Sequence, residues 1–255
     1  KPLIQYAVEE AISSGIQEII LITSPAKQGL HHYFEPDPAL ESFLKEKSSS
    51  ALLDSVRQIA SLAHISYVQQ QQPLGLGDAL LKAKTIVGEE PFAIILPDDF
   101  ILSCEPTLKQ MIEVYQDHGG GLIAIEEVSK DRLSSYGVIN PEPISDTLYK
   151  ICGLVEKPTT EEAPSDLAIV GRYILPPTIF GCLEKINPGE HREIQLTEGL
   201  QFLMETENLY GYKFEGSRYD TGNPIGHLQA TIALALQENE TKDIILETLK
   251  RHLET

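Results

Sequence analysis

Two adjacent carboxylates follow a short apolar segment near the middle of the chain. Residues Phe92 to Leu96 have the pattern of a buried strand, and Pro97 separates them from Asp98 and Asp99. In an open α/β sheet, ligands bind outside the carboxyl ends of the strands. A carboxylate at that edge can hold Mg2+ against a bound phosphate. The same two side chains could instead cap the next helix or face water, so this segment alone leaves both interpretations open.

A third carboxylate, Asp220, lies just before a predicted helix. Asn223 suits the N-cap of that helix, and Pro224 suits its first position. Capping therefore accounts for Asn223 and Pro224 but gives Asp220 no role. Asp220 is either a second metal ligand or an ordinary surface carboxylate.

A glycine-containing turn, Gly75-Leu76-Gly77, follows the predicted strand Ile65 to Val68. Glycines let the backbone approach a ligand closely. The dinucleotide-binding fingerprint would need a third glycine, and Leu80 stands at that position. Taken alone, the pattern favours an ordinary tight turn into a helix.

An acid–base pair, Glu156-Lys157, ends another predicted strand and precedes Pro158. A lysine can meet a phosphate as a point charge, and a glutamate can accept hydrogen bonds from sugar hydroxyls. The alternative is a surface turn with a solvated ion pair.

The elements that must position these residues alternate between helix and strand in the first half of the chain. Strand patterns occur at 18–22, 65–68, 92–96 and 122–125, with helical patterns between them. This alternation predicts an α/β fold with a mostly parallel sheet and helices on both faces. The second half is less regular. Its strand patterns are at 137–140, 148–155, 168–175 and 209–214, and its helical patterns are at 197–205, 224–237 and 243–252.

The bulk composition limits the possible functions. The 255 residues carry a formal net charge of −18, and such a surface repels the phosphates of nucleic acid. A bound triphosphate would need a divalent metal and a few well-placed cations. The longest apolar run is far shorter than the ~20 residues that span a bilayer, and three scattered cysteines show no metal or disulfide spacing. We expect a soluble, cytoplasmic protein that binds neither nucleic acid nor membrane.

Eight segments, in this order, carry a resemblance to a known family. They are KPLIQYAVEEA, QQPLGLGDAL, FAIILPDD, SSYGVI, LVEKP, IVGRYIL, HREIQLTEGL and YDTGNPIGHLQA. Each segment is unspecific alone, but the ordered set resembles the sugar-1-phosphate nucleotidyltransferases, and most closely the bacterial UTP–glucose-1-phosphate uridylyltransferases. VGRY followed by EIQLT resembles the uridylyl branch more than the thymidylyl branch.

The resemblance implies a Rossmann-like mixed sheet with inserted sugar-binding strands, in a single domain. Its nucleotide-binding part would be 1–127, its sugar-binding part 128–223 and its C-terminal helices 224–255. The implied reaction is an in-line attack of glucose 1-phosphate on the α-phosphorus of UTP, which yields UDP-glucose and pyrophosphate without a protein nucleophile. Relatives of this kind form dimers or tetramers, so a homo-oligomer is expected.

The resemblance also assigns roles to single residues. Gln70 and Gly75 would contact the uracil, Asp98 and Asp220 would bind Mg2+, and Lys1 would lie near the phosphates. The remaining implied residues bind the sugar phosphate: Lys157 contacts its phosphate, Glu156 contacts its hydroxyls, and Gly137 and Gly171 line its pocket.

The sequence departs from the family pattern in two places. The family's glycine-rich loop, with a Gly-Thr-Arg core, precedes its Lys-Pro segment, whereas this sequence begins at Lys1-Pro2. We therefore expect the sequence to belong to a longer chain. Thr221 stands where many relatives carry cysteine. Three other functions are considered: the same chemistry with dTTP or another sugar phosphate, a non-catalytic sugar-nucleotide-binding protein, and a dinucleotide-dependent oxidoreductase.

Overall fold

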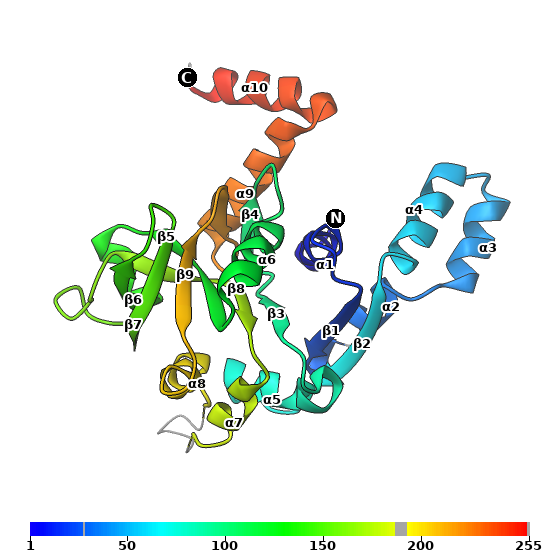
Figure 1. Cartoon of the computed structure of the whole chain (residues 1–255). Coiled ribbons are helices and arrows are strands. Elements are labelled where there is room, and N and C mark those ends of the chain that lie inside the picture. Colours follow the sequence, from blue (N-terminus) through cyan, green and yellow to red (C-terminus); the bar gives the residue numbers. More distant parts are fainter. Residues whose placement is uncertain (28, 187–192, 254–255) are drawn as a thin grey trace.

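A computed structural model describes residues 1–27, 29–186 and 193–253 (Figure 1). Its main sheet has six strands in the order β3-β8-β5-β9-β7-β6. Two smaller sheets pair β1 with β2 and β4 with β10. The strands are β1 (Glu18–Thr23), β2 (His64–Gln69), β3 (Phe92–Ile95), β4 (Asp99–Leu102), β5 (Gly121–Glu127), β6 (Gly137–Pro143), β7 (Leu148–Glu156), β8 (Leu167–Leu175), β9 (Leu209–Lys213) and β10 (Ser217–Asp220).

The described helices alternate with these strands in the first half of the chain, as expected. They are α1 (Leu3–Ser13), α2 (Gly29–Tyr33), α3 (Pro38–Glu46), α4 (Ser50–Ala60), α5 (Leu76–Val87), α6 (Thr107–His118), α7 (Thr178–Leu183), α8 (Leu196–Leu203), α9 (Pro224–Gln237) and α10 (Asn239–Leu253). Short 3-10 turns cover Pro25–Lys27 and Lys130–Ser135. None of the described helices is long and apolar enough to cross a membrane.

The α/β class and the mixed sheet are confirmed, but parallel pairing does not predominate. Among the described strands, β1–β2 and β5–β9 are parallel, and the other ladders are antiparallel. One reason is that β8 lies between β3 and β5 and runs antiparallel to both. Another is that β6 and β7 are joined by a short turn, and a short turn can connect only antiparallel neighbours.

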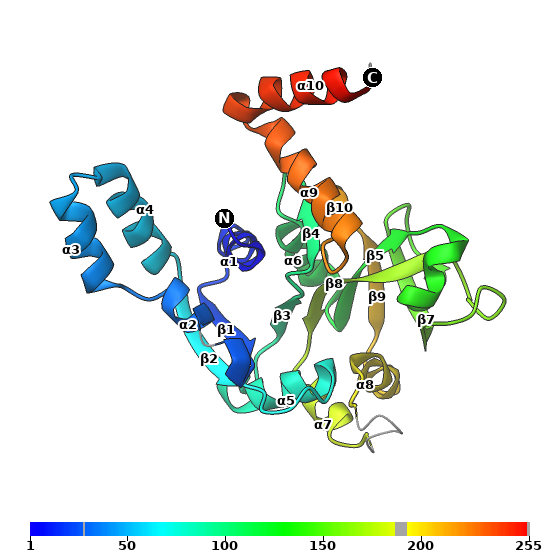
Figure 2. The ribbon, with the colours of Figure 1, turned by 180° about the vertical axis from the view of Figure 1, so that it is seen from behind.

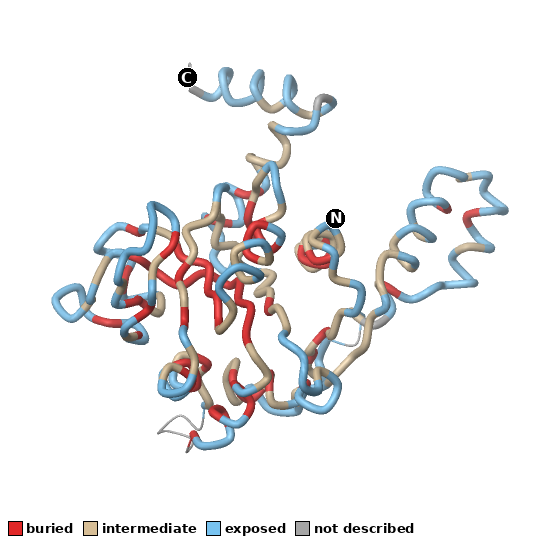
Figure 3. Tube along the Cα trace, viewed as in Figure 1, coloured by how far each residue is buried: buried red, intermediate tan, exposed pale blue. Residues whose placement is uncertain are grey.

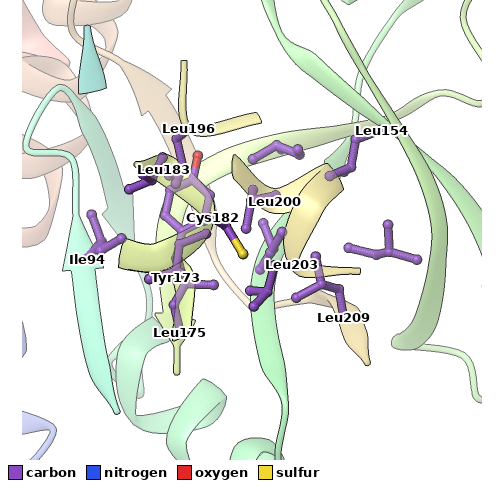
Figure 4. Packing of buried hydrophobic residues seen from close by; sticks show 14 of the residues in the cluster. Ile94, Leu154, Tyr173, Leu175, Cys182, Leu183, Leu196, Leu200, Leu203 and Leu209 are labelled. Carbon is purple, nitrogen blue, oxygen red and sulfur yellow. The ribbon is translucent and has the colours of Figure 1, made fainter. Parts of the chain in front are cut away.

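The six-stranded sheet is covered by helices on both faces, and successive side chains of its central strands point to opposite faces. Ile123 and Ile125 of β5 pack against α5, α7 and α8, whereas Leu122 and Ala124 pack against α6 and α1. Every residue of β8 is buried, as expected of a strand that is covered on both faces. Figure 4 shows the first of these two clusters, in which Leu183, Leu200 and Leu203 lie over the sheet. Figure 3 shows that burial is concentrated in this region.

Helix α1 joins the main sheet to the β1–β2 pair. Its residue Val8 packs on Leu21 of β1 and on Phe34, whereas Ala11 packs with Leu108 and Met111 of α6. The α3–α4 pair and the α9–α10 pair extend away from the sheets on different sides of the molecule (Figures 1 and 2).

Several elements were not predicted from the sequence. Helix α3 lies in a polar stretch, where Asp37 caps it by accepting from the N–H groups of Ala39 and Leu40. Strands β4 and β10 have four residues each and pair with one another, so their stability comes from a partner distant in sequence. Asp99 and Asp220 stand opposite each other in their ladder.

Candidate active site

A cavity of about 280 Å³ lies at the edge where β4, β6, β7, β8 and β10 meet. Five of the residues expected at the site line it: Asp98, Gly137, Glu156, Gly171 and Asp220. Its other lining residues are Leu76, Leu96, Asp99, Ser135, Tyr136, Ile169, Tyr173, Gln195, Leu196, Thr197 and Arg218. Segments from most of the chain therefore converge on one hollow.

The two candidate metal ligands, Asp98 and Asp220, are brought together by hydrogen bonds of the segment after β10. The N–H and hydroxyl of Thr221 donate to the carbonyl oxygen of Asp98 at 2.7 and 2.8 Å. A Cβ placed on Gly222 would lie 3.2 Å from Asp220 Oδ1 and 3.6 Å from Asp98 Oδ2. Both carboxylates thus border the same space, which stays open because residue 222 has no side chain.

This donor set fits Mg2+. The ion prefers oxygen ligands, and proteins hold it through one or two carboxylates while substrate phosphates and water complete the octahedron. The described residues contain no group of three or more His, Cys, Asp or Glu side chains that could hold a metal alone. A metal site built from Asp98 and Asp220 would need further ligands, such as phosphate oxygens or water.

The opposite wall of the cavity is formed around two glycines and a glutamate. Gly137 and Glu156 face each other in the β6–β7 ladder, and a Cβ on Gly137 would lie 3.2 Å from Glu156 Oε2. A Cβ on Gly171 would lie 2.6 Å from Leu96 Cβ and 2.7 Å from Asp99 Oδ2. Any larger residue at either position would crowd this wall. The Glu156 carboxylate accepts a 2.6 Å hydrogen bond from the Thr197 hydroxyl, which fixes one of its oxygens.

Asp99 does not take either of the ordinary roles considered for it. Its side chain is only 14% exposed, and it pairs with the guanidinium of Arg218, whose side chain is 3% exposed. Burial raises the pKa of Asp99, although the Arg218 charge opposes that shift. Burial by itself would lower the pKa of Arg218, but the charge and hydrogen bonds of Asp99 and Tyr136 together outweigh it and raise that pKa. Asp99 is therefore an internal ion-pair partner beside the exposed Asp98.

The two residues expected to contact a base, Gln70 and Gly75, lie together beside the cavity. Gln70 Nε2 donates to Gly75 O at 3.0 Å and to Asp78 Oδ2 at 2.9 Å. Gly75 has a φ of +92°, and a Cβ there would lie 2.6 Å from the carbonyl oxygen of Ile194. The turn is thus pressed against the segment before α8, and its next residue, Leu76, lines the cavity.

The two lysines expected near the phosphates do not line this cavity. Lys157 follows Glu156 directly, has a φ of 47°, and donates its N–H to Tyr136 O at 3.0 Å. Lys1 Nζ pairs with Glu9 Oε2 at 2.6 Å and lies 4.8 Å from the centre of the Tyr6 ring. Glu9 and Tyr6 border a different cavity, between α1, β4 and α9.

The lining residues that were missed from the sequence include Tyr136, Tyr173, Thr197 and Arg218. The first three stand inside the motif segments SSYGVI, IVGRYIL and EIQLT, so those segments held a signal that was not used. Tyr173 is buried, and burial raises the pKa of its hydroxyl. Arg218 has no comparable signal. His191 and Arg192 of the HREIQLTEGL segment lie outside the described residues.

Comparison with known proteins gives a consistent result. Residues 1–237 match the family model described as nucleotidyl transferase. The chain is 40% identical over 250 residues to the UTP–glucose-1-phosphate uridylyltransferase 1 of Staphylococcus saprophyticus, covering 98% of this chain and 87% of that protein.

Similar solved structures include two that cover most of the chain. One is a UDP-glucose pyrophosphorylase complexed with UDP-glucose, with a TM-score of 0.84 and 40% identity, covering 93% of this chain and 88% of that one. The other is the UTP-bound enzyme from Acinetobacter baumannii, with a TM-score of 0.89 and 34% identity, covering 98% of this chain and 87% of that one.

Proposed function

Because this chain belongs to the nucleotidyl transferase family, we propose that it is an enzyme that makes UDP-glucose and pyrophosphate from UTP and glucose 1-phosphate. The observation that carries the proposal is the convergence of Asp98 and Asp220 with the narrow wall of Gly137, Glu156 and Gly171 in one cavity. The relative of 40% identity bears the name of this activity.

The reaction is a displacement at phosphorus. An oxygen of glucose 1-phosphate forms a bond to the α-phosphorus of UTP, and the bond from that phosphorus to the bridging oxygen of the β-phosphate breaks. Pyrophosphate leaves with that oxygen and its electron pair. No side chain needs to form a covalent bond, so the protein contributes positioning and charge stabilisation.

Each half of the cavity has its own task in this proposal. Asp98 and Asp220 hold Mg2+, which when bound offsets the negative charge of the reacting phosphates. Glu156, held by Thr197, accepts hydrogen bonds from the sugar hydroxyls. Gly137 and Gly171 leave room for the sugar ring. Lys157 does not line the cavity but follows Glu156 directly, and its role in binding the phosphate of glucose 1-phosphate stays a prediction.

The uracil is assigned to the turn beside the cavity. The Gln70 amide nitrogen is used by Gly75 and Asp78, so the amide oxygen is the atom that would accept the uracil N3–H. A phosphate role for Lys1 stays a prediction, and it requires the ammonium to leave Glu9.

The test is a comparison of nucleotides under Mg2+. We expect UTP and glucose 1-phosphate to give equal amounts of pyrophosphate and UDP-glucose, resolved by anion-exchange chromatography, and dTTP to give much less product. Faster turnover with dTTP would show that thymine is the preferred base, while the proposed type of reaction would remain. Tight UDP-glucose binding with no turnover would favour a non-catalytic binding protein.

We further propose a homo-oligomer that uses the α9–α10 arm. Ile225, Leu228 and Ile244 on these helices are 60–71% exposed, which is unusual for large apolar side chains. Sedimentation of Ile225→Glu and Ile244→Glu variants tests this, because unchanged assembly would contradict it.

A cytoplasmic location and the three-part domain organisation stay proposals. The free state of Cys104, Cys152 and Cys182 is in keeping with a reducing compartment.

A further inference from the structure

Arg218 is a buried charge at the edge of the cavity, and its contacts reach three neighbouring elements. Its Nε donates to Asp99 Oδ1 at 2.5 Å, and its Nη2 also contacts that oxygen. Its Nη1 reaches Glu126 Oε2 on β5 at 3.4 Å. Its guanidinium carbon lies 4.7 Å from the centre of the Tyr136 ring. A planar guanidinium can make an ion pair and stack on an aromatic ring at the same time.

Two of these contacts lead onward to groups that the proposed function uses. On one side, Asp99 Oδ2 accepts the N–H of Gly171 at 2.7 Å and so fixes the sugar wall. On the other side, the Tyr136 hydroxyl donates to Asp220 Oδ2 at 3.3 Å. A single side chain, Arg218, therefore joins the wall of the sugar pocket to a candidate metal ligand.

The Tyr136 hydroxyl is held from outside as well. Arg132 Nη2 donates to that hydroxyl oxygen at 2.7 Å, which leaves the hydroxyl hydrogen to point at Asp220. The ring itself is held on its face by Arg218 and approached by Arg132, whose guanidinium carbon is 5.6 Å from the ring centre. Both the position of the ring and the direction of its proton are thus set by cations.

We propose that Arg218 and Tyr136 are positioning residues that orient the Asp220 carboxylate for Mg2+. The inference rests on the proposed function, since it takes Asp220 as a ligand. Arg218 holds the ring, and Tyr136 holds the Oδ2 oxygen of the carboxylate. The other oxygen, Oδ1, accepts the N–H of Gly222 at 3.2 Å and borders the space that Asp98 shares. Partners that orient a metal ligand in this way commonly change metal affinity by about 10–100-fold when they are removed.

The experiment measures metal binding directly, without turnover. Free Mn2+ is counted by its EPR signal in the presence of UDP-glucose, for the parent protein, Tyr136→Phe, Arg218→Lys and Asp220→Asn. Tyr136→Phe removes only the hydroxyl and keeps the stacked ring, so it folds even if Arg218 variants do not. Lys213→Gln is the matched control because it breaks an exposed ion pair with Glu127, the neighbour of Glu126 on β5.

We expect Tyr136→Phe and Arg218→Lys to weaken Mn2+ binding by about tenfold or more. The melting temperature of Tyr136→Phe and the Mn2+ binding of Lys213→Gln should equal those of the parent protein. Parent-like Mn2+ binding by Tyr136→Phe would overturn the inference while leaving the proposed function in place. Parent-like binding by Asp220→Asn would overturn the metal assignment itself, and the inference with it.

Discussion

The carboxylates of Asp98 and Asp220 border one open space although the two residues are far apart in the sequence, with strands β5 to β9 between them. The carbonyl oxygen of Asp98 accepts both hydrogen bonds of Thr221, the residue after Asp220. Strands β4 and β10 pair antiparallel, so this short ladder delivers the two side chains to the same edge. The separation of the two carboxylates thus depends on backbone pairing rather than on flexible loops.

Neutralising either carboxylate should stop the reaction without unfolding the protein. We expect Asp98→Asn and Asp220→Asn each to lower kcat by about 10²–10³-fold, because a fixed charge at the reacting phosphates is lost. Thermal melting should show little change. Asp117→Asn, on the exposed side of α6, is the control and should keep parent activity. Near-parent kcat in both site variants would remove the metal assignment.

Thr197→Val should affect the sugar phosphate and spare the nucleotide. Its hydroxyl donates to Glu156 at 2.6 Å, and without it the carboxylate loses one fixed orientation. We expect the KM for glucose 1-phosphate to rise about threefold to tenfold, because the misoriented carboxylate loses only part of the about 1.5–3 kcal/mol that a hydrogen bond to a charged group contributes. The KM for UTP should stay the same.

Thr159→Val provides a matched comparison for this change. Its hydroxyl makes the same kind of bond, to Glu162 at 2.9 Å, on an exposed turn. Steady-state kinetics of both variants, with each substrate varied, gives the answer. A rise in the KM for UTP in Thr197→Val would indicate that Glu156 contacts UTP, which contradicts its assignment to the sugar hydroxyls.

Gly171→Ala should damage both the fold and the pocket. The added methyl would meet Leu96 Cβ at 2.6 Å and Asp99 Oδ2 at 2.7 Å, so the strand or the ion pair must move. We expect about 1–3 kcal/mol of destabilisation in urea unfolding, as for other overpacked cores, together with lower turnover. Gly181→Ala on α7 meets nothing within 4 Å and is the control. Equal stability of the two variants would contradict the close packing at Gly171.

Leu200→Ala tests the main core rather than the site. Leu200 of α8 is 1% exposed and packs in the cluster over the sheet. We expect a loss of about 2–5 kcal/mol in the free energy of unfolding, because the removed methyl groups leave a cavity. Phe202 on the same helix is 36% exposed, so Phe202→Ala should lower the free energy of unfolding much less. A larger loss of stability in Phe202→Ala than in Leu200→Ala would indicate that the Phe202 face of α8 packs on the core instead.

Much of the local structure could be predicted from the sequence because its signals are local. Asn223 accepts the N–H of Gly226 at 2.9 Å and Pro224 begins α9, as the capping pattern predicts. Gly15 ends α1 with a φ of +91°. Apart from Gly171 and Arg172, the residues of β8 are apolar or aromatic, as expected for a doubly covered strand.

What the sequence could not predict depends on partners far away in the chain. The four residues of β4 come directly after Pro97 and Asp98, which end the β3 pattern, and only their pairing with β10 makes them a strand. Insertion of β8 between β3 and β5 likewise reverses the expected parallel order, and no local signal encodes that choice. Arg218 is an ordinary basic residue in the sequence, and its burial against Asp99 exists only once that ladder has formed.

The measurement that tests the central claim most directly is a calorimetric titration of this chain with UDP-glucose in the presence of Mg2+. Titrations with dTDP-glucose and NAD serve as comparisons, and Lys157→Ala serves as the site variant. We predict that UDP-glucose binds in preference to both other ligands and that Lys157→Ala weakens this binding. Equal or tighter binding of NAD, or UDP-glucose binding that Asp98→Asn, Lys157→Ala and Asp220→Asn all leave unchanged, would contradict the account.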